Sequence, residues 1–183
     1  MAVQLLVPYF ADDIWDTPDD GKRYEVVDGV MYVSPPPVPD HQYAVTWLVV
    51  LVATHVRTHD LGVVYTAPIG VVLNVSIAVQ PDLVYVSRER AHLISERGIE
   101  GAPDLVVEVP SPSTRGRDRN AKLRAYANGG VPHYWIADPR ARTLDPLRLG
   151  PTGYTSLGVL HPGDLFEPEL FPGLKIPIDS LWP

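Results

Sequence analysis

Two carboxylates lie in apolar stretches of the sequence, where ionised side chains are uncommon. Asp82 falls within Val79–Val86, a run of mostly β-branched and apolar residues. Glu108 follows three apolar residues, Leu105–Val107. Burying an ionised carboxylate costs free energy unless the group is paired or binds a cation. The simpler alternatives are that Asp82 only begins its strand and bonds the turn, and that Glu108 forms a buried ion pair with an arginine or lysine.

Lys122 is the third candidate for a site residue. It lies in the segment Arg115–Arg124, which holds five of the 15 basic residues of the chain. The helix expected there follows the strand of Glu108, so its first turns return over the end of that strand. Lys122 then reaches the same pocket as Glu108. The alternative is a surface ion pair between Lys122 and Asp118, four residues earlier.

Two carboxylates and a lysine at the ends of adjacent strands suit metal-assisted hydrolysis of a phosphodiester. Mg²⁺ or Mn²⁺ prefers hard oxygen ligands and can activate water, while a lysine stabilises the developing negative charge or orients the water. Paired carboxylates also serve glycoside hydrolysis. That reaction needs an aromatic-lined cleft, and the four tryptophans are too scattered along the sequence to indicate one.

The elements that must position these residues follow from turn signals and apolar patterning. Asp28-Gly29 between Tyr24–Val27 and Val30–Val33 predicts a β-hairpin. A run from His41 to His59 without Gly or Pro predicts a helix, with Asp40 as its N-cap and apolar residues nearly all round, as in a buried core helix. Further strands are expected at Val63–Tyr65, Gly70–Leu73, Val79–Val86, Ala102–Val109 and Val131–Ala137, and helices at Arg88–Glu96 and Arg117–Asn128.

This order of elements predicts an α/β (α+β) layered domain with a mixed central sheet and a helix on each side. A β-hairpin precedes the sheet, and a β-rich tail follows it. On the strand of Glu108, alternation places Val106 and Glu108 on one face. We expect a single domain over residues 1–183, in which residues 1–21 form an acidic N-terminal extension.

The composition is globular and excludes several classes of function. The 183 residues are 45% hydrophobic and 20% charged, and they include no cysteine, which excludes a disulfide scaffold and thiolate metal sites. The net charge of −7 speaks against a protein that coats polyanions generally. No apolar run is long enough to span a bilayer, and no signal peptide is visible, so we expect a cytoplasmic protein without a membrane partner.

Eight short motifs occur in one order along the chain. They are Tyr24–Gly29, Pro39–Gln42, Val79–Leu83, Ala102–Glu108, Ser111–Thr114, Lys122 with Tyr126-Ala127, His133–Ile136 with Asp138-Pro139, and Phe171–Leu174. Together they resemble the Uma-type restriction endonuclease family, a branch of the PD-(D/E)XK nuclease superfamily, over roughly residues 22–182. Each motif alone is weak, but eight in this order are a strong signal.

The resemblance implies a restriction endonuclease-like core, αβββαβ, with a Mg²⁺ or Mn²⁺ site formed by Asp82 and Glu108. Proline occupies the usual lysine position, Pro110, and the family takes the lysine from the next helix, here Lys122. Glu25 and His41 match further polar positions of the family site. Alternatively, Glu25 is a surface residue of an edge strand, and His41 caps the start of its helix.

The resemblance also implies a nucleic-acid substrate, most simply DNA, whose phosphates would meet the basic segment. The candidate phosphate contacts are Arg115, Arg117, Arg119 and Arg124. We expect a homodimer, because one site cuts one strand, and because the apolar tail Leu170–Ile178 can pack on a partner or on its own core. The rival function is a nuclease-fold protein that binds nucleic acid or a protein partner without cutting, which the net charge and Pro110 favour.

Overall fold

The computed structural model describes residues 8–110 and 118–183, without the side chains of Asp118 and Arg119. Its helices are α1 (Pro39–Thr58) and α2 (Asp118–Asn128), with short 3-10 helices η1 (Ala11–Asp16), η2 (Arg88–Leu93) and η3 (Ile178–Leu181). Its strands are β1 (Arg23–Val27), β2 (Val30–Ser34), β3 (Gly62–Thr66), β4 (Val71–Asn74), β5 (Ile77–Val79), β6 (Leu83–Ser87), β7 (Ile99–Glu100), β8 (Leu105–Glu108), β9 (His133–Asp138), β10 (Thr143–Gly150), β11 (Gly153–Ser156), β12 (Leu165–Phe166) and β13 (Ile176–Pro177).

The main sheet has six strands in the order β11-β10-β9-β8-β6-β3. Strands β3, β6 and β8 pair antiparallel, whereas β8 and β9 pair parallel across the connection that contains α2. With α1 before β3, the chain follows the order αβββαβ, which confirms the predicted fold class. β8, the strand of Glu108, lies inside the sheet with neighbours on both sides.

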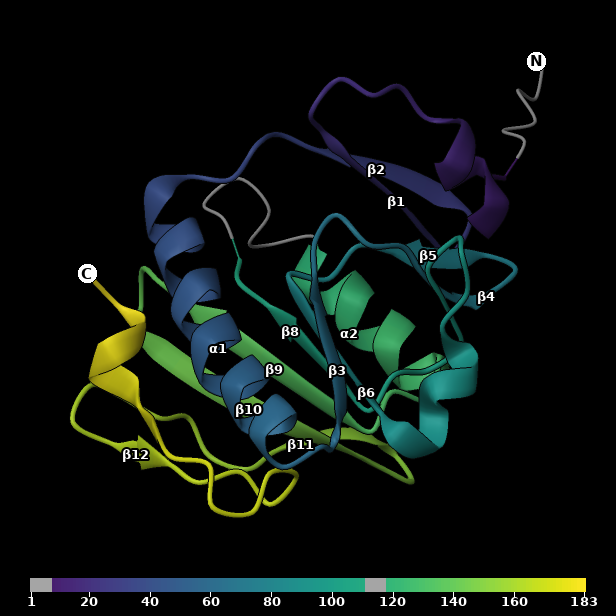
Figure 1. Ribbon diagram of the computed structural model, residues 1–183. Helices are drawn as coiled ribbons and strands as arrows, with labels where there is room; N and C mark the ends of the chain where they lie inside the picture. Colours follow the sequence, from purple (N-terminus) through teal and green to yellow (C-terminus); the bar gives the residue numbers. More distant parts are fainter. Residues whose placement is uncertain (1–7, 111–117) are drawn as a thin grey trace.

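A second sheet of five strands, β2-β1-β5-β4-β7, covers part of the main sheet. The predicted hairpin is confirmed as β1 and β2, and its turn residues Asp28 and Gly29 both have positive φ, 51° and 76°. A two-residue turn with both φ values positive matches the twist of the flanking strands, which explains the Asp-Gly pair. Figure 1 shows this sheet above the six-stranded sheet, on the side of α2.

The six-stranded sheet buries a different set of side chains on each face. On one face, α1 and the C-terminal segment pack against Leu105, Val107 and Trp135. Figure 1 shows α1 in front of the strands of this sheet. On the other face, α2 and the five-stranded sheet pack against Val106 and Ile136. The predicted alternation along the Glu108 strand is therefore confirmed, because odd and even positions enter different cores. Glu108 faces the core that contains α2.

Three details differ from the sequence predictions. Helix α1 has Val38 as its N-cap, so Asp40 lies in the first turn and makes no cap. The helix is also not buried all round: Trp47 and Val50 are exposed, because only one side faces the sheet. The expected strand Val79–Val86 is divided into β5 and β6, because Pro81 cannot donate a ladder hydrogen bond.

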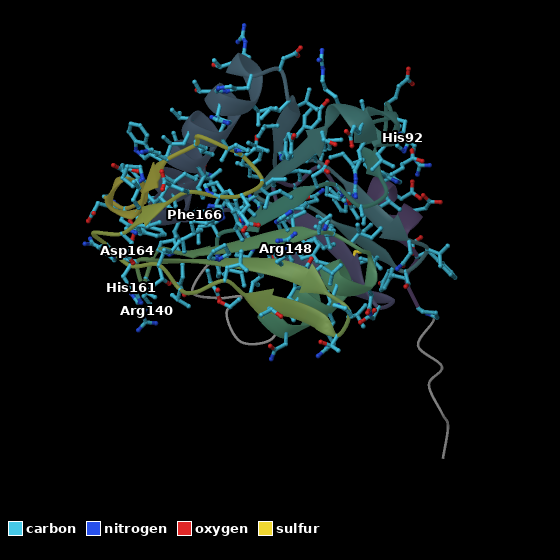
Figure 2. All side chains as sticks on the ribbon, turned by 90° about the horizontal axis from the view of Figure 1, so that it is seen from below. His92, Arg140, Arg148, His161, Asp164 and Phe166 are labelled. Carbon is cyan, nitrogen blue, oxygen red and sulfur yellow. The ribbon has the colours of Figure 1, made fainter. Side chains whose placement is uncertain are left out.

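The remaining departures concern surface segments and the tail. The segment after Ser87 forms the 3-10 helix η2 rather than an α-helix to Glu96. In the tail, Phe171, Ile176 and Ile178 are buried within the protein's own core, so no partner is needed to cover them. Figure 2 shows His92 and His161 at opposite ends of the molecule, consistent with isolated surface histidines. Among the described residues, no helix is long and apolar enough to cross a membrane.

Candidate active site

The register of the central strands brings the two predicted carboxylates together. Leu83 of β6 pairs with Val107 of β8, so the next pair along the ladder is Asp82 opposite Glu108. Residues opposite each other in antiparallel strands have Cβ atoms about 5 Å apart. Asp82 lies directly before β6, at the start of the strand, as the simpler alternative predicted. However, it is 2% exposed, and its carboxylate contacts side chains of residues far from the turn in sequence.

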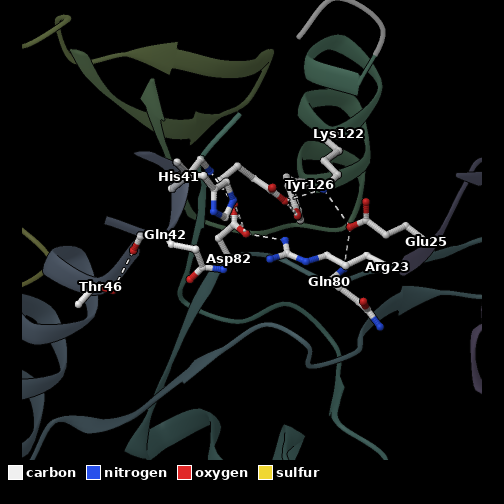
Figure 3. Close-up of polar contacts among 11 residues, drawn as sticks. Arg23, Glu25, His41, Gln42, Thr46, Gln80, Asp82, Lys122 and Tyr126 are labelled. Carbon is white, nitrogen blue, oxygen red and sulfur yellow. Dashed lines mark hydrogen bonds and ion pairs between the residues drawn. The ribbon is translucent and has the colours of Figure 1, made fainter. Parts of the chain in front are cut away.

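Asp82 has partners from three different elements. The Arg23 guanidinium of β1 and the His41 imidazole of α1 contact its Oδ1, at 2.5 Å and 3.1 Å (Figure 3). The backbone N–H of Val109 donates to its Oδ2 at 2.7 Å. These contacts hold Asp82 at the point where β1, α1 and β8 meet.

Glu108 is held from helix α2. The ammonium of Lys122 and the hydroxyl of Tyr126 both donate to Glu108 Oε1, at 3.0 Å and 2.5 Å (Figure 3). Lys122 and Tyr126 are four residues apart, so they share one face of the helix. The side chain of Lys122 is 14% exposed. It is therefore a buried partner of the site carboxylates and does not end at the surface.

Glu25 completes the lysine's surroundings. Its Oε1 lies 2.9 Å from Lys122 Nζ and accepts a hydrogen bond from the backbone N–H of Gln80 at 2.8 Å. Glu25 is 4% exposed, so the alternative of a surface residue is wrong. The hydrogen bond from Gln80 holds the Glu25 carboxylate in place, because Glu25 lies on β1 and Gln80 directly follows the neighbouring strand β5.

His41 points from the first turn of α1 into the site and is buried. It does not cap the helix, because Val38 is the N-cap and the His41 ring contacts Asp82. The carboxylate can only accept, so Nε2 carries the proton that faces Asp82. Nδ1 finds no hydrogen-bond partner among the described residues. His41 therefore fixes the orientation of Asp82 through a single hydrogen bond.

The charges of the cluster shift several pKa values. Burial, together with the charges of Asp82 and Glu25, raises the pKa of Glu108 to about 7, against the attraction of Lys122. Burial alone would lower the pKa of Lys122, but the carboxylates of Glu108 and Glu25 hold it above its usual value. Burial opposes ionisation of Asp82 too, yet the His41 hydrogen bond and the Arg23 charge keep its pKa below the usual value.

The donor set suits a hard divalent cation. Three buried carboxylates face two fixed cations, Arg23 and Lys122, so negative charge is in excess when His41 is neutral. Within the described residues, no three Asp, Glu, His or Cys side chains converge on one point as a complete ligand set. Mg²⁺ commonly takes only one or two carboxylates and fills its other positions with water and phosphate oxygens. Asp82 and Glu108 fit that pattern in type and charge.

Two residues of the cluster were absent from the sequence-based site. Arg23 lies two positions before Glu25 on β1, and this period-2 spacing places both side chains on one face. Tyr126 lies one helical turn after Lys122, and this spacing indicates that the two side chains share one face of the helix and can reach the same site. Of the predicted phosphate contacts, Arg124 is exposed on α2. The residues Arg115 and Arg117 and the side chain of Arg119 lie outside the described part of the chain.

Comparisons with known proteins place this architecture. A solved structure from Anabaena variabilis ATCC 29413, described as a putative nuclease belonging to DUF820, superposes with a TM-score of 0.79. The two chains are 19% identical, and the match covers 95% of this chain and 97% of the other. No similar sequence is found among the curated proteins. A family model named Uma2, with the description "Putative restriction endonuclease", matches residues 12–179. Since that match spans most of the sequence, the chain belongs to the Uma2 family.

Proposed function

We propose that this protein is a metal-dependent nuclease that hydrolyses phosphodiester bonds, with DNA as the substrate. The observation that carries the proposal is the position of Lys122 Nζ, within 3.0 Å of both Glu25 and Glu108. This position supports a helix lysine that serves in place of the strand lysine, whose usual position is occupied by Pro110. The description of the Uma2 family as restriction endonucleases supports the same reaction class.

Each residue of the cluster has a separate role in this reaction. Asp82 and Glu108 would hold Mg²⁺ or Mn²⁺, which supplies an activated water and neutralises charge on the phosphate. Lys122 donates hydrogen bonds to the attacking water or to the phosphate oxygens as negative charge develops. Glu25 holds the ammonium in position at 2.9 Å. Tyr126 and His41 are positioning residues, because each fixes the carboxylate of a metal ligand.

The experiment combines Mn²⁺ titration calorimetry with a plasmid-nicking assay on wild type, Glu108→Gln and Lys122→Ala. Glu108→Gln keeps the shape but removes a ligand charge, so metal affinity and cleavage should fall together. Lys122→Ala should still bind metal, while cleavage falls by about 10²–10³-fold, the scale for losing one preorganised electrostatic contact. Lys175→Ala is the control, because its partner Glu167 and Lys175 itself are well exposed. A fully active Lys122→Ala protein would contradict the role of the helix lysine.

A second function is favoured by the saturation of Asp82. Both of its carboxylate oxygens already have partners within the protein, Arg23 and His41 on one and Val109 on the other. A protein that keeps these contacts would bind nucleic acid or a protein partner without cutting it. Wild type that binds duplex DNA but cleaves no nucleic acid with Mg²⁺ or Mn²⁺ would favour this function. Calorimetry then distinguishes a protein that binds metal from one that binds none.

A further inference from the structure

Arg23 occupies an exposed boundary of an otherwise buried site. Its guanidinium contacts Asp82 Oδ1, but about 23% of its side chain is exposed, compared with 2% for Asp82. Arg23, His41 and Asp82 lie together in the wall of an open pocket of about 290 Å³. The pocket continues along α1, past Gln42 and Thr46. Arg23 and His41 therefore line the approach from this pocket to Asp82.

The three partners of Asp82 among the described residues differ in how freely they can leave it. The Val109 N–H belongs to the backbone directly after β8 and cannot move without disturbing the main sheet. His41 is 4% exposed and is fixed by the first turn of α1. Arg23 alone of these three contacts Asp82 through a long, partly exposed side chain. It is the partner that can move away without disturbing the main sheet or α1.

The charge of the site gives a reason for such movement. A divalent cation at Asp82 would lie beside the Arg23 guanidinium, and two cations in contact repel each other. A displaced guanidinium needs another anion at the mouth of the pocket. The planar guanidinium matches phosphate oxygens with two parallel hydrogen bonds. A phosphodiester at the mouth of this pocket would supply that anion.

We propose that Arg23 is a displaceable counter-ion that neutralises Asp82 in the free protein and transfers to a substrate phosphate when a divalent cation binds. This inference rests on the proposed function, since it assumes that Asp82 is a metal ligand. It assigns Arg23 two successive partners, Asp82 and then the phosphodiester. It also names the pocket between α1 and Asp82 as the route by which metal and phosphate reach the site.

The first test measures Mn²⁺ binding by calorimetry without nucleic acid. Arg23→Gln removes the competing cation, so Mn²⁺ should bind at least about tenfold more tightly. A tenfold change in affinity corresponds to an interaction that shifts a pKa by one unit. Arg23→Lys keeps a positive charge and should bind close to wild type, which controls for altered folding. Lys22→Gln is the matched control, because the neighbouring Lys22 pairs with the exposed Asp20, and its replacement should leave the Mn²⁺ affinity unchanged.

The outcomes separate this inference from the proposed function. Equal or weaker Mn²⁺ binding by Arg23→Gln, with normal binding by wild type, overturns the counter-ion role and leaves the metal site standing. Absence of Mn²⁺ binding in both proteins overturns the metal site itself, and both proposals with it. Binding by Arg23→Gln but not by wild type supports a counter-ion that wild type does not release to Mn²⁺ alone.

The second test measures the transfer to phosphate by the salt dependence of duplex DNA binding. Fluorescence anisotropy is recorded with Ca²⁺, which takes the same oxygen ligands, and with a chelator instead. With Ca²⁺, Arg23→Gln should reduce the slope of log K against log salt by about 0.9, the value for one phosphate contact. With the chelator the slopes should be equal, because Arg23 is then held by Asp82. A reduction of the same size in both conditions, or in neither, overturns the transfer.

Discussion

The replacement of Lys122 by methionine tests whether the cluster depends on the lysine charge. Methionine has a similar length and an apolar end, so the main change is loss of the ammonium. The substitution leaves Glu25 and Glu108 buried without the cation that lies 2.9 Å and 3.0 Å from them. The folded protein should therefore lose stability, and the loss should depend on pH.

The expected size follows from the two contacts. At these distances each attraction is about 5.5 kcal/mol with an effective dielectric constant of about 20, before desolvation is subtracted. Removal of one partner from a buried ion pair typically costs about 3–5 kcal/mol in net stability. The pKa of Glu108 is about 7, so most Glu108 is ionised at pH 8 and protonated at pH 5.5. Protonation of Glu108 removes the charge from its contact with Lys122, so the cost of the substitution should be smaller at pH 5.5 than at pH 8.

Urea unfolding in a chelator at pH 8 and pH 5.5 measures this difference. Lys175→Met is the matched control, because its ion pair with Glu167 is 3.3 Å long with both side chains more than half exposed. Such pairs contribute about 1 kcal/mol or less. Equal stability losses for Lys122→Met and Lys175→Met at pH 8 would refute the reasoning. So would a loss for Lys122→Met that is as large at pH 5.5 as at pH 8.

Three further predictions concern Glu108 and the assembly. The pKa of Glu108 is raised, mainly by burial, from 4.5 to about 7, so between these pH values the folded protein binds a proton that the unfolded chain has lost. The stability of the wild type should therefore fall by roughly 3 kcal/mol as the pH rises from 4.5 to 7. Urea unfolding of Glu108→Gln should show no such fall. The Tyr126 hydrogen bond lowers the pKa of Glu108, so Tyr126→Phe should move the same pH transition upward, and a transition at unchanged or lower pH would contradict that role. The protein should be a homodimer in light scattering at micromolar concentration, and a monomer mass would contradict this expectation.

Much of the fold could be predicted because its signals are local. The Asp-Gly turn of the β1–β2 hairpin and the apolar alternation of β8 each involve only a few neighbouring residues. Glu108 was identifiable for the same reason, since a carboxylate after three apolar strand residues requires a buried partner. Its partner on the helix was also expected, because the helix follows the strand of Glu108 and its first turns return over the end of that strand.

The rest of the site depends on contacts between residues far apart in sequence. Arg23 meets Asp82 across 59 positions, and no local pattern around Arg23 indicates that contact. The exposed side of α1 was missed because valine and tryptophan read as core residues whether or not a second layer covers them. Trp47 lies on the side without such a layer. Local apolar content thus predicted the helix but not how much of it would be buried.

The position of the cluster between two sheets has a consequence for folding. Arg23 and Glu25 come from the five-stranded sheet, whereas Glu108 ends a central strand of the other sheet and Asp82 directly precedes its neighbour β6. Contacts of such high sequence separation form late, because the chain must close long loops before they can be made. A folding intermediate with only the six-stranded sheet would hold Asp82 without its arginine and Lys122 without Glu25. The nascent chain therefore acquires a complete cluster only when β1 has met β6, β8 and α2.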